Sequence, residues 1–592
     1  MHLLCTRNVY VMMQSRHLGG WIGLMFIRRI KRANGQVSIV LVEGYRENGK
    51  VKQRTVEYLG TESELTKDDP DAVNKLINKY KKAQNSKDAF IKLTINLAEK
   101  ISDRNTVRNY GYFYLDKMFS ELGIDTLCNE IQTGTKIEYS LKDCLRLMCF
   151  MRALKPSSKK SCQERGFDYF FEDFNLKLEQ IYKSLTVFDE NKDNFIKQIH
   201  HSLCEKYDRK TDILYYDVTN YFFEIDNEDE FRKKGCSKEH RPLPIVQMGM
   251  FIDNQGLPVD YYLYEGNKTD CTTLKPSFDE VKNTYKADKV IITADKGLNN
   301  GPNLGYILSN GNGYIVSQKI RGAGKVLQAE VLNEDGWHTN LSGDFRFKEF
   351  TRNIDVEAPD GKIINHDQKV VCIWSRKYQV KEKSARDALL EKIVTLASDP
   401  AKFKQSCHKG MKKYIDEITV DKSTGEENKT VKVTTSLNLE KIAKDEALDG
   451  YYLIVTSETH LSLSEIIEKY RGLWRIEQSF RITKSDIHGR PVFVRTKEHI
   501  NAHFLTCFIT LTMLRMLEIR LNRKYSAKAI IDGLNSAVAV DIGKEIYQIN
   551  RRDDVVDELD QIYGLDFSNR YVRKENMTIH HSEIINSLYT TL

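Results

Sequence analysis

Three acidic residues interrupt segments that are otherwise apolar. Asp217 lies within the strand-like run ILYYDV, and Asp295 lies where IITAD meets a Lys-Gly turn. Glu477 lies in YRGLWRIEQSFRITK, and at about 100° per residue it shares one helical face with four apolar side chains, those of Leu473, Trp474, Ile476 and Phe480. A carboxylate on such a face requires a cation, a metal or a proton, because burying an unmatched charge is costly.

These three carboxylates would form one cluster if the two strands and the later helix meet at one edge of a sheet. Carboxylates this close stay ionised together only with divalent cations between them. Mg²⁺ suits the set, because it takes few carboxylates and keeps its other positions for water and phosphate oxygens. A pair of such ions can activate a water or a 3′-hydroxyl and stabilise the leaving oxygen of a phosphodiester. Each residue alone also has a simpler interpretation: Asp217 as a strand-end aspartate, Asp295 as an Asx turn and Glu477 as a salt-bridge partner.

Basic residues surround the third acid. From Tyr470 to His503 there are seven Lys or Arg residues against three acids. This local excess suits a phosphate backbone, and a solvated helix face is the alternative. His499 and His503 have the i, i+4 spacing of a zinc pair, but no further ligand series accompanies them, so a packed or phosphate-facing pair is favoured. The segment RGAGKV over 321–326 lacks the first Gly of a P-loop and a Ser or Thr after its Lys, which argues against an ATPase.

The elements that would position these residues alternate between strands and helices. Three runs rich in β-branched and aromatic residues predict an antiparallel start to a mixed sheet. A helix-length stretch, TTLKPSFDEVKNTYK, precedes the next strand, and a strand after such a crossover pairs in parallel. One long helix, capped by Ser462 or Ser464, is predicted for the segment LSLSEIIEKYRGLWRIEQSF. The predicted strands of this region are 212–226, 244–267, 289–297, 313–320 and 450–458.

The remaining segments differ in composition from this α/β region. From Phe26 to Gly60, three β-type runs are punctuated by two Asn-Gly pairs, which predicts a small basic β-meander. We expect an extension or a mis-chosen start over 1–24, the meander over 25–64, a helical domain over 65–205, a first core part over 206–320, an insertion over 321–445, a second core part over 446–530 and a C-terminal helical region over 531–592.

Composition limits the class of protein. With 592 residues, the chain is long enough for several domains. Its 90 Lys and Arg against 83 Asp and Glu make it mildly basic, so the placement of charge matters more than its sum. Eleven Cys without a CxxC pair indicate reduced thiols and a cytosolic setting. The longest apolar run, Phe504 to Leu514, is shorter than the ~20 residues that span a bilayer, so it predicts a buried core helix and no membrane partner.

The sequence resembles the DDE transposases of bacterial insertion sequences, whose catalytic core is ribonuclease-H-like. The matching text is YYDVTNYFFE, GCSKEHRPLPIVQMGMF, YEGNKTDCTTLKP, TADKG and YRGLWRIEQSFRITKSDIHGRPVFVRTKEHINAHF. The branch that it resembles, of the IS-four superfamily type, has a Y-x2-R-x3-E-x6-K signature and a β-rich insertion between the second and third acids. Tyr470, Glu477 and Lys484 occupy the Y, E and K positions. Leu473 stands at the Arg position, and Arg481, one turn after Glu477, is the candidate for the missing guanidinium.

The resemblance implies a fold and a set of site residues. The fold would be α/β, a ribonuclease-H-like mixed sheet with flanking helices, interrupted by a β-rich insertion and preceded by the β-meander and a helical domain that binds DNA ends. Catalysis and metal binding would fall to Asp217, Asp295 and Glu477. DNA phosphates would be bound by Tyr470, Arg471, Arg475, Arg481 and Lys484, and a flipped base would stack on Trp337 or Trp374.

The resemblance also implies a reaction and its partners. The protein would bind the terminal inverted repeats of its own element and catalyse strand cleavage and strand transfer with Mg²⁺, or with Mn²⁺ as a substitute. It would act as a homodimer in a synaptic complex with transposon ends and target DNA, in the cytoplasm at the nucleoid. Two alternatives stay open: a nuclease that cuts without joining, and a non-catalytic DNA-binding repressor derived from a transposase. The intact acids argue against the repressor.

Overall fold

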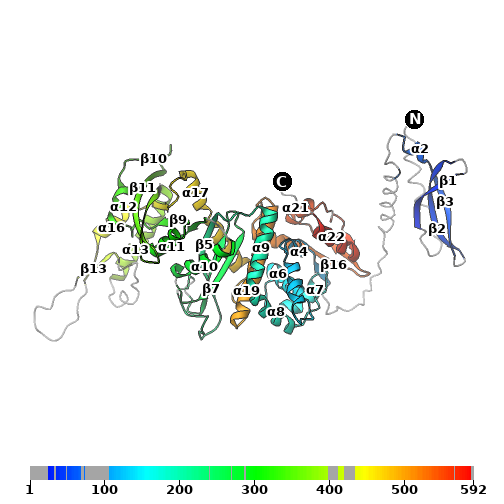
Figure 1. Cartoon of the computed structure of the whole chain (residues 1–592), viewed down its shortest axis with the longest axis horizontal. Coiled ribbons are helices and arrows are strands. Elements are labelled where there is room, and N and C mark those ends of the chain that lie inside the picture. The colour runs from blue at the N-terminus through cyan, green and yellow to red at the C-terminus, as the bar shows by residue number, and fades with distance from the viewer. Residues whose placement is uncertain are drawn as a thin grey trace, which may run out of the picture. The chain divides into compact units, whose positions relative to one another are not determined.

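The structure is a computed structural model, and it divides the chain into two compact units, Met1–Ile101 and Ser102–Leu592 (Figure 1). The described residues are 24–32, 35–47, 50–67, 73, 106–235, 237–238, 241–268, 270–285, 289–397, 411, 413–418, 434–565 and 567–587. The predicted N-terminal extension therefore lies outside the described residues apart from Leu24. The hairpin-tip residues Asn34, Asn48 and Gly49 also lie outside them.

The first unit contains the predicted β-meander. Strands β1 (Leu24–Lys31), β2 (Val37–Glu47) and β3 (Lys50–Thr61) pair antiparallel in chain order, and the short helix α2 (Glu62–Leu65) follows them. Successive β2 residues from Ile39 to Val42 are buried. The Glu47–Lys50 pair flanks a two-residue connection, which is the loop length that an Asn-Gly turn predicts.

Helices form the first part of the second unit. After the short strand β4 (Val107–Asn109) come α4 (Tyr112–Glu121), α5 (Ile124–Thr133), α6 (Leu141–Leu154), α7 (Lys159–Tyr169), α8 (Leu178–Glu190) and α9 (Lys192–Tyr207). Of these helices, α4, α6 and α8 contact α19 (Lys497–Arg520), which also contacts the sheet strand β7 (Pro258–Glu265). Among the described residues, α19 is the helix long and apolar enough to cross a membrane, but 94% of its apolar window is buried inside the protein. The prediction of a buried core helix is confirmed.

The large sheet has nine strands in the order β10-β11-β12-β15-β9-β8-β5-β6-β7. Strand β5 (Ile213–Phe222) pairs antiparallel with β6 (Ile245–Ile252), and β6 pairs antiparallel with β7. Helix α10 (Asp270–Tyr285) then crosses over to β8 (Ile291–Ala294), which pairs in parallel with β5 and with β9 (Gly313–Gln318). Helix α11 (Gly301–Ser309) connects β8 to β9. The predicted antiparallel start and parallel continuation of a mixed α/β sheet are confirmed.

Most strands between the second and third acids extend this sheet, and one hairpin forms a separate two-stranded sheet. After α12 (Lys325–Leu332), strands β10 (His338–Thr339), β11 (Phe345–Glu357) and β12 (Ile363–Ser375) pair antiparallel in turn. Strand β12 then pairs with β15 (Tyr451–Thr456), which joins β9. Between β12 and β15 lie α13 (Arg376–Ala397), the hairpin β13 (Ile415–Ile418) and β14 (Thr434–Leu437), and α16 (Leu439–Ala447).

The C-terminal segment is not purely helical, contrary to the prediction for 531–592. It contains the helices α20 (Ala527–Ser536), α21 (Asp554–Ile562) and α22 (Lys574–Asn586), together with a four-stranded antiparallel sheet in the order β18-β17-β16-β4. The strands β16 (Val538–Asp541), β17 (Ile546–Ile549) and β18 (Tyr571–Arg573) have four residues or fewer. Strands this short show little alternation, and the partner strand β4 comes from far earlier in the chain, so local sequence patterns did not indicate the sheet.

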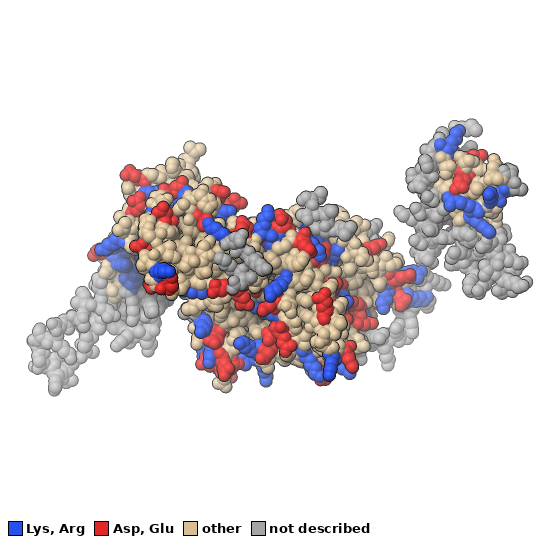
Figure 2. All heavy atoms as spheres, in the orientation of Figure 1, with Lys and Arg blue, Asp and Glu red and all other residues tan. Residues whose placement is uncertain are grey.

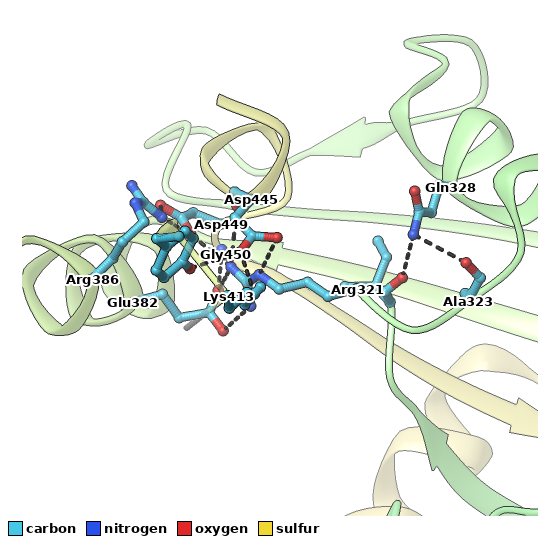
Figure 3. A network of polar contacts seen from close by, with 11 residues as sticks. Arg321, Ala323, Gln328, Glu382, Arg386, Lys413, Asp445, Asp449 and Gly450 are labelled. Atoms are coloured by element: carbon cyan, nitrogen blue, oxygen red, sulfur yellow. Dashed lines mark hydrogen bonds and ion pairs between the residues drawn. The ribbon is translucent and has the colours of Figure 1, made fainter. Parts of the chain in front are cut away.

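A buried ion-pair network fastens α13 to the sheet beside β15 (Figure 3). Arg386 of α13 donates from Nη1 to both carboxylate oxygens of Asp449 at 2.6 Å, and the two side chains are 5% and 1% exposed. Arg321, which follows β9, donates to Asp449 at 2.7 Å and to Glu382 at 2.9 Å. Glu382 also accepts from the backbone N–H of Gly450 at 3.0 Å. Arg321 is the first residue of the RGAGKV segment, so this segment has a structural role in the network.

Replacing Asp449 with Ala should lower the stability of the second unit strongly. The substitution leaves the buried Arg386 guanidinium without its carboxylate, a loss of about 3–5 kcal/mol for a broken buried pair. The matched control is Lys444→Ala, which breaks an ion pair whose side chains are 66% and 80% exposed, and should change stability by less than about 1 kcal/mol. The measurement is the thermal midpoint of unfolding. Equal shifts for the two variants would contradict the assignment of this network as a fastening of α13.

Candidate active site

Asp217 and Asp295 lie side by side at matching positions on two parallel strands. The last registered pair of β5 and β8 is Tyr216 with Ala294, and each of these residues is followed by one of the two acids. Tyr216 and Ala294 point into one buried core of the sheet, so the next residues point to the opposite face. Neighbouring strands are about 4.8 Å apart, which makes the two carboxylates neighbours.

Both aspartates bond to nearby backbone groups and still reach the surface. Asp217 is half-buried and accepts from the N–H of Val218 at 2.7 Å. Asp295 is exposed and accepts from the N–H of Lys296, while the Ser317 hydroxyl lies 3.5 Å from its carboxylate. The Lys296 contact agrees with the turn interpretation of Asp295, and it leaves the second carboxylate oxygen available.

The predicted long helix before the third acid is broken in two. Helix α17 (Leu463–Arg471) begins at Ser462, whose side chain forms a capping box with Glu465, and α18 spans Trp474–Arg481. Gly472 lies between them, where a Cβ would fall 2.1 Å from the Tyr215 hydroxyl. Hydrogen bonds of the i to i−3 type tighten the turn here, from Leu473 to Tyr470 (3.1 Å), from Arg475 to Gly472 (3.0 Å) and from Ile476 to Leu473 (3.1 Å).

Only part of the predicted apolar face of α18 is buried. Ile476 and Phe480 are buried as predicted, whereas Trp474 is 52% exposed and Glu477 is also exposed. The prediction that Glu477 lies on an apolar face was wrong. At about 100° per residue, Phe480 lies about 40° around α18 from Ile476, whereas Glu477 lies about 100° and Trp474 about 160° from it, so these two residues fall outside the buried face. An exposed carboxylate needs no internal cation, and it is accessible to solvent and to a ligand.

Helix α18 is attached to β5 at both ends. Gly472, just before the helix, lies against the ring of Tyr215. Thr483, just after the helix, has its hydroxyl 2.8 Å from that of Tyr221. Tyr215 and Tyr221 belong to the core that also contains Ile476 of α18, so α18 covers their face of β5.

Asp217 shares that face, because alternate residues of a strand point to the same side. Asp217 lies about 7 Å along the strand from Tyr215 at ~3.3 Å per residue, and Glu477 lies about 7.5 Å along the helix from Gly472 at ~1.5 Å per residue. The two carboxylates are therefore at similar levels, one on the strand and one on the helix that covers it.

Tyr470 lies near both Glu477 and Asp295. Its ring packs edge-on against that of Tyr452, with centroids 5.8 Å apart. Burial raises the pKa of the Tyr470 phenol, and the carboxylates of Asp295 and Glu477 raise that pKa further. Two of the three acids are thus close enough to act electrostatically on one phenol, and Asp217 is adjacent to Asp295 across the strand pair.

The donor set fits a divalent ion of the Mg²⁺ type. Within the described part of the chain, no group of three carboxylate, imidazole or thiol side chains is close enough to hold a metal ion by itself. Mg²⁺ is usually bound by one or two carboxylates and fills its other positions with water and phosphate oxygens. Asp217 and Asp295 would supply the carboxylates, with Glu477 across from them on α18.

The predicted phosphate-binding cations differ in their surroundings. Arg471 and Arg481 are exposed, and Lys484 is half-buried with its ammonium 5.6 Å from the ring centroid of Tyr221. Arg475 instead donates from Nη1 to the Asn254 carbonyl at 2.8 Å, which ties it to the turn between β6 and β7. On the face drawn in Figure 2, basic and acidic side chains are interspersed.

The two tryptophans proposed for base stacking are both engaged in packing. Trp337 donates from Nε1 to the Asn333 carbonyl at 3.1 Å, and its ring lies 5.7 Å from that of Tyr451 with Arg346 4.9 Å from its centroid. A Cβ at Gly450 would fall 2.8 Å from Nε1 of Trp374, so that indole lies against the backbone.

Two cationic side chains near β5 were not predicted as site residues from the sequence. The guanidinium of Arg241 lies 4.3 Å from the ring centroid of Phe222, and that of Arg490 lies 5.6 Å from the same centroid. Phe222 ends β5, five residues after Asp217. Arg490 belongs to the basic segment 470–503, but the sequence did not single it out as a site residue. Nothing in the sequence around Arg241 indicates that it lies near β5.

Substituting Gly472 with Ala should destabilise the protein by about 1–3 kcal/mol, because the new methyl group would push the Tyr215 ring out of its packed position. The control is Gly301→Ala, where a Cβ meets no atom within 4 Å. Thermal midpoints provide the comparison. If Gly472→Ala costs as much in a Tyr215→Leu background as in the natural chain, contact with the ring is not the cause.

Comparisons with known proteins identify the family of the chain. Residues 209–513, just over half of the chain, match the transposase DDE domain, and residues 27–89 match the N-terminal domain of IS1634 family transposases. No curated protein matches the sequence. Among solved structures, a piggyBac transposase synaptic complex with hairpin DNA matches at 9% identity, covering 81% of this chain and 85% of that chain with a TM-score of 0.31. The chain belongs to the DDE transposase family, whose members are polynucleotidyl transferases that typically use divalent metal ions.

Proposed function

We propose that the protein binds the terminal inverted repeats of its own insertion sequence and catalyses Mg²⁺-dependent cleavage and strand transfer there. The observation that carries the proposal is the parallel register of β5 and β8, which makes Asp217 and Asp295 neighbours on the face covered by α18. Glu477, exposed on α18, completes the catalytic set. End recognition is assigned to the domain that was predicted over 65–205, of which residues 68–72 and 74–105 lie outside the described residues. A homodimer is assigned to the pairing of two ends at the nucleoid.

Each side chain has a distinct role in this proposal. The carboxylates of Asp217, Asp295 and Glu477 hold the metal, which when bound supplies an activated water or 3′-hydroxyl and a counter-charge for the leaving oxygen. Tyr470 stays protonated, because burial and two carboxylates raise its pKa, and it can donate a hydrogen bond to a phosphate oxygen. Lys484 provides positive charge on the same side of β5.

The branch with the Y-x2-R-x3-E-x6-K signature remains the best assignment for residues 470–484. Leu473, at the Arg position, is 9% exposed and packs in the core beside Ile476. A guanidinium at this position would lose its solvent, so the phosphate-binding Arg is better supplied from a neighbouring position. Arg481 is exposed at the end of α18 and carries that role in this proposal.

Asp217→Asn, Asp295→Asn and Glu477→Gln should each reduce strand cleavage on the order of 10²-fold and leave binding of the end duplex nearly unchanged. Metal positioning depends on the carboxylates, whereas end affinity depends on cations that these substitutions leave in place. A gel-shift titration beside a Mg²⁺-dependent cleavage assay measures both properties on an inverted-repeat duplex. Cleavage near the natural rate by any one variant would remove that residue from the set. Cutting without joining by the natural protein would favour the nuclease alternative.

Arg481→Ala should reduce cleavage about ten- to hundredfold, because a charged hydrogen bond to phosphate is worth roughly 1.5–3 kcal/mol. It should also lower the salt dependence of end binding by about one phosphate contact. Arg475→Ala is the matched control on the same helix: it loses a bond to the Asn254 carbonyl and should lower the thermal midpoint more than the cleavage rate. A larger cleavage defect in Arg475→Ala would transfer the role to that residue.

A further inference from the structure

The segment after α18 is a π-helical turn with Lys484 at its centre. Residues Ile482–Asp486 form this turn, η2, and the N–H of Ile487 donates to the carbonyl of Ile482 at 3.0 Å. A π turn contains one residue more than the α-helical turn that it replaces, and such turns are frequent at functional sites. Relaxation to a regular α-helix would therefore rotate Lys484 relative to Glu477 by up to about 100°.

The end of η2 has a backbone conformation that needs support. His488 has a φ of +48°, in the left-handed region that residues with a Cβ seldom adopt. The N–H of Gly489 donates to the Thr483 carbonyl at 2.7 Å, and a Cβ at Gly489 would lie 2.6 Å from that oxygen. The turn thus closes on itself through Thr483, whose hydroxyl already contacts Tyr221 of β5.

Two buried side chains from other elements hold the carbonyls of this turn. Arg152 of α6 is 6% exposed and donates from Nη1 to the His488 carbonyl at 3.0 Å. His503 of α19 is 3% exposed, and its Nε2 lies 3.0 Å from the Gly489 carbonyl, which it can contact only as a donor. Burial lowers the pKa of His503, and the charges of Arg152 and Lys159 lower that pKa further, so the ring is neutral with its proton on Nε2.

Burying the Arg152 side chain does not favour the stability of the fold. Its guanidinium is buried, and Nε has no hydrogen-bond partner in the structure. Lys159 adds further positive charge nearby, since burial lowers its pKa and the charge of Arg152 lowers that pKa further. Among the described residues, no carboxylate forms an ion pair with Arg152 to offset this charge. An apolar side chain of similar length would avoid this desolvation cost, which indicates that the bond to the His488 carbonyl is the reason for a cation here.

We propose that Arg152 and His503 are positioning residues for the cleavage reaction: by holding the His488 and Gly489 carbonyls they keep η2 in its π-helical form and so direct Lys484 toward the phosphate at the acidic site. The inference rests on the proposed function, because Lys484 matters only if that site acts on a phosphodiester. It assigns a catalytic contribution to the helical region, through α6, in addition to end recognition.

A double-mutant cycle on cleavage of an inverted-repeat duplex tests the proposal. Arg152→Met should reduce cleavage on the order of tenfold with end binding retained, and should cause little further loss in a Lys484→Ala background, because the two changes remove the same contribution. Arg146→Met is the matched control, since Arg146 is a buried residue of the same helix that pairs with Asp116 and Glu172. Any cleavage loss that it causes should add in full to that of Lys484→Ala. Full additivity for Arg152→Met, or unchanged cleavage, would overturn the proposal.

A second variant and a second measurement separate this inference from the proposed function. His503→Phe removes the contact with Gly489 and should show the same non-additivity with Lys484→Ala. Amide hydrogen exchange of the full chain without DNA should be faster at Ile487 and Gly489 in both variants, and unchanged there in Arg146→Met. Unchanged exchange at these amides would refute the holding contact even if cleavage falls. Failure of both variants to fold would also refute the proposal, because Arg152 and His503 would then be required for folding rather than for positioning Lys484. A natural protein that does not cleave the duplex would refute the proposed function, while the exchange result would still stand.

Discussion

Parallel pairing between β5 and β8 sets the geometry of the acidic site. A parallel neighbour requires a crossover, and α10 provides it, so that both strands run in one direction and both bear an aspartate one residue beyond the same registered pair. A slip of one residue in either strand would send its carboxylate into the core on the other face. The register is protected because that other face is lined by Tyr216 and Ala294 in a buried core.

The position of the third carboxylate, that of Glu477, is set by a steric contact rather than by an ion pair. Gly472 brings the chain directly onto the Tyr215 ring, and Thr483 returns to β5 at Tyr221. Between these two contacts α18 turns its apolar residues toward β5 and leaves Glu477 exposed. This exposure suits the role proposed for Glu477 in metal binding, because a fully buried carboxylate would favour its neutral form.

The sheet is also stabilised far from the acids. Strands β10, β11 and β12 continue it beyond β15, and the pair of Arg386 with Asp449 fastens α13 beside that extension. On the other side of the unit, α6 and α19 contribute Arg152 and His503 to the turn after α18. The segments before and between the acids thus support α18 and its sheet through hydrogen bonds and ion pairs.

The sequence by itself determined the strand-and-helix alternation and the parallel crossover, because β-branched runs, turn residues and helix-length spacers are local signals. It also predicted the buried core helix that became α19. Tertiary structure alone decided the break at Gly472, which depends on a ring more than 250 residues earlier, and it decided which face of α18 packs against β5, leaving Glu477 and Trp474 exposed. It likewise decided the pairing of β4 with β16, the attachment of Arg475 to Asn254 and the contacts of Arg152 and His503 with the π turn. These features join residues distant in the chain, and their geometry is set by packing, which no local periodicity encodes.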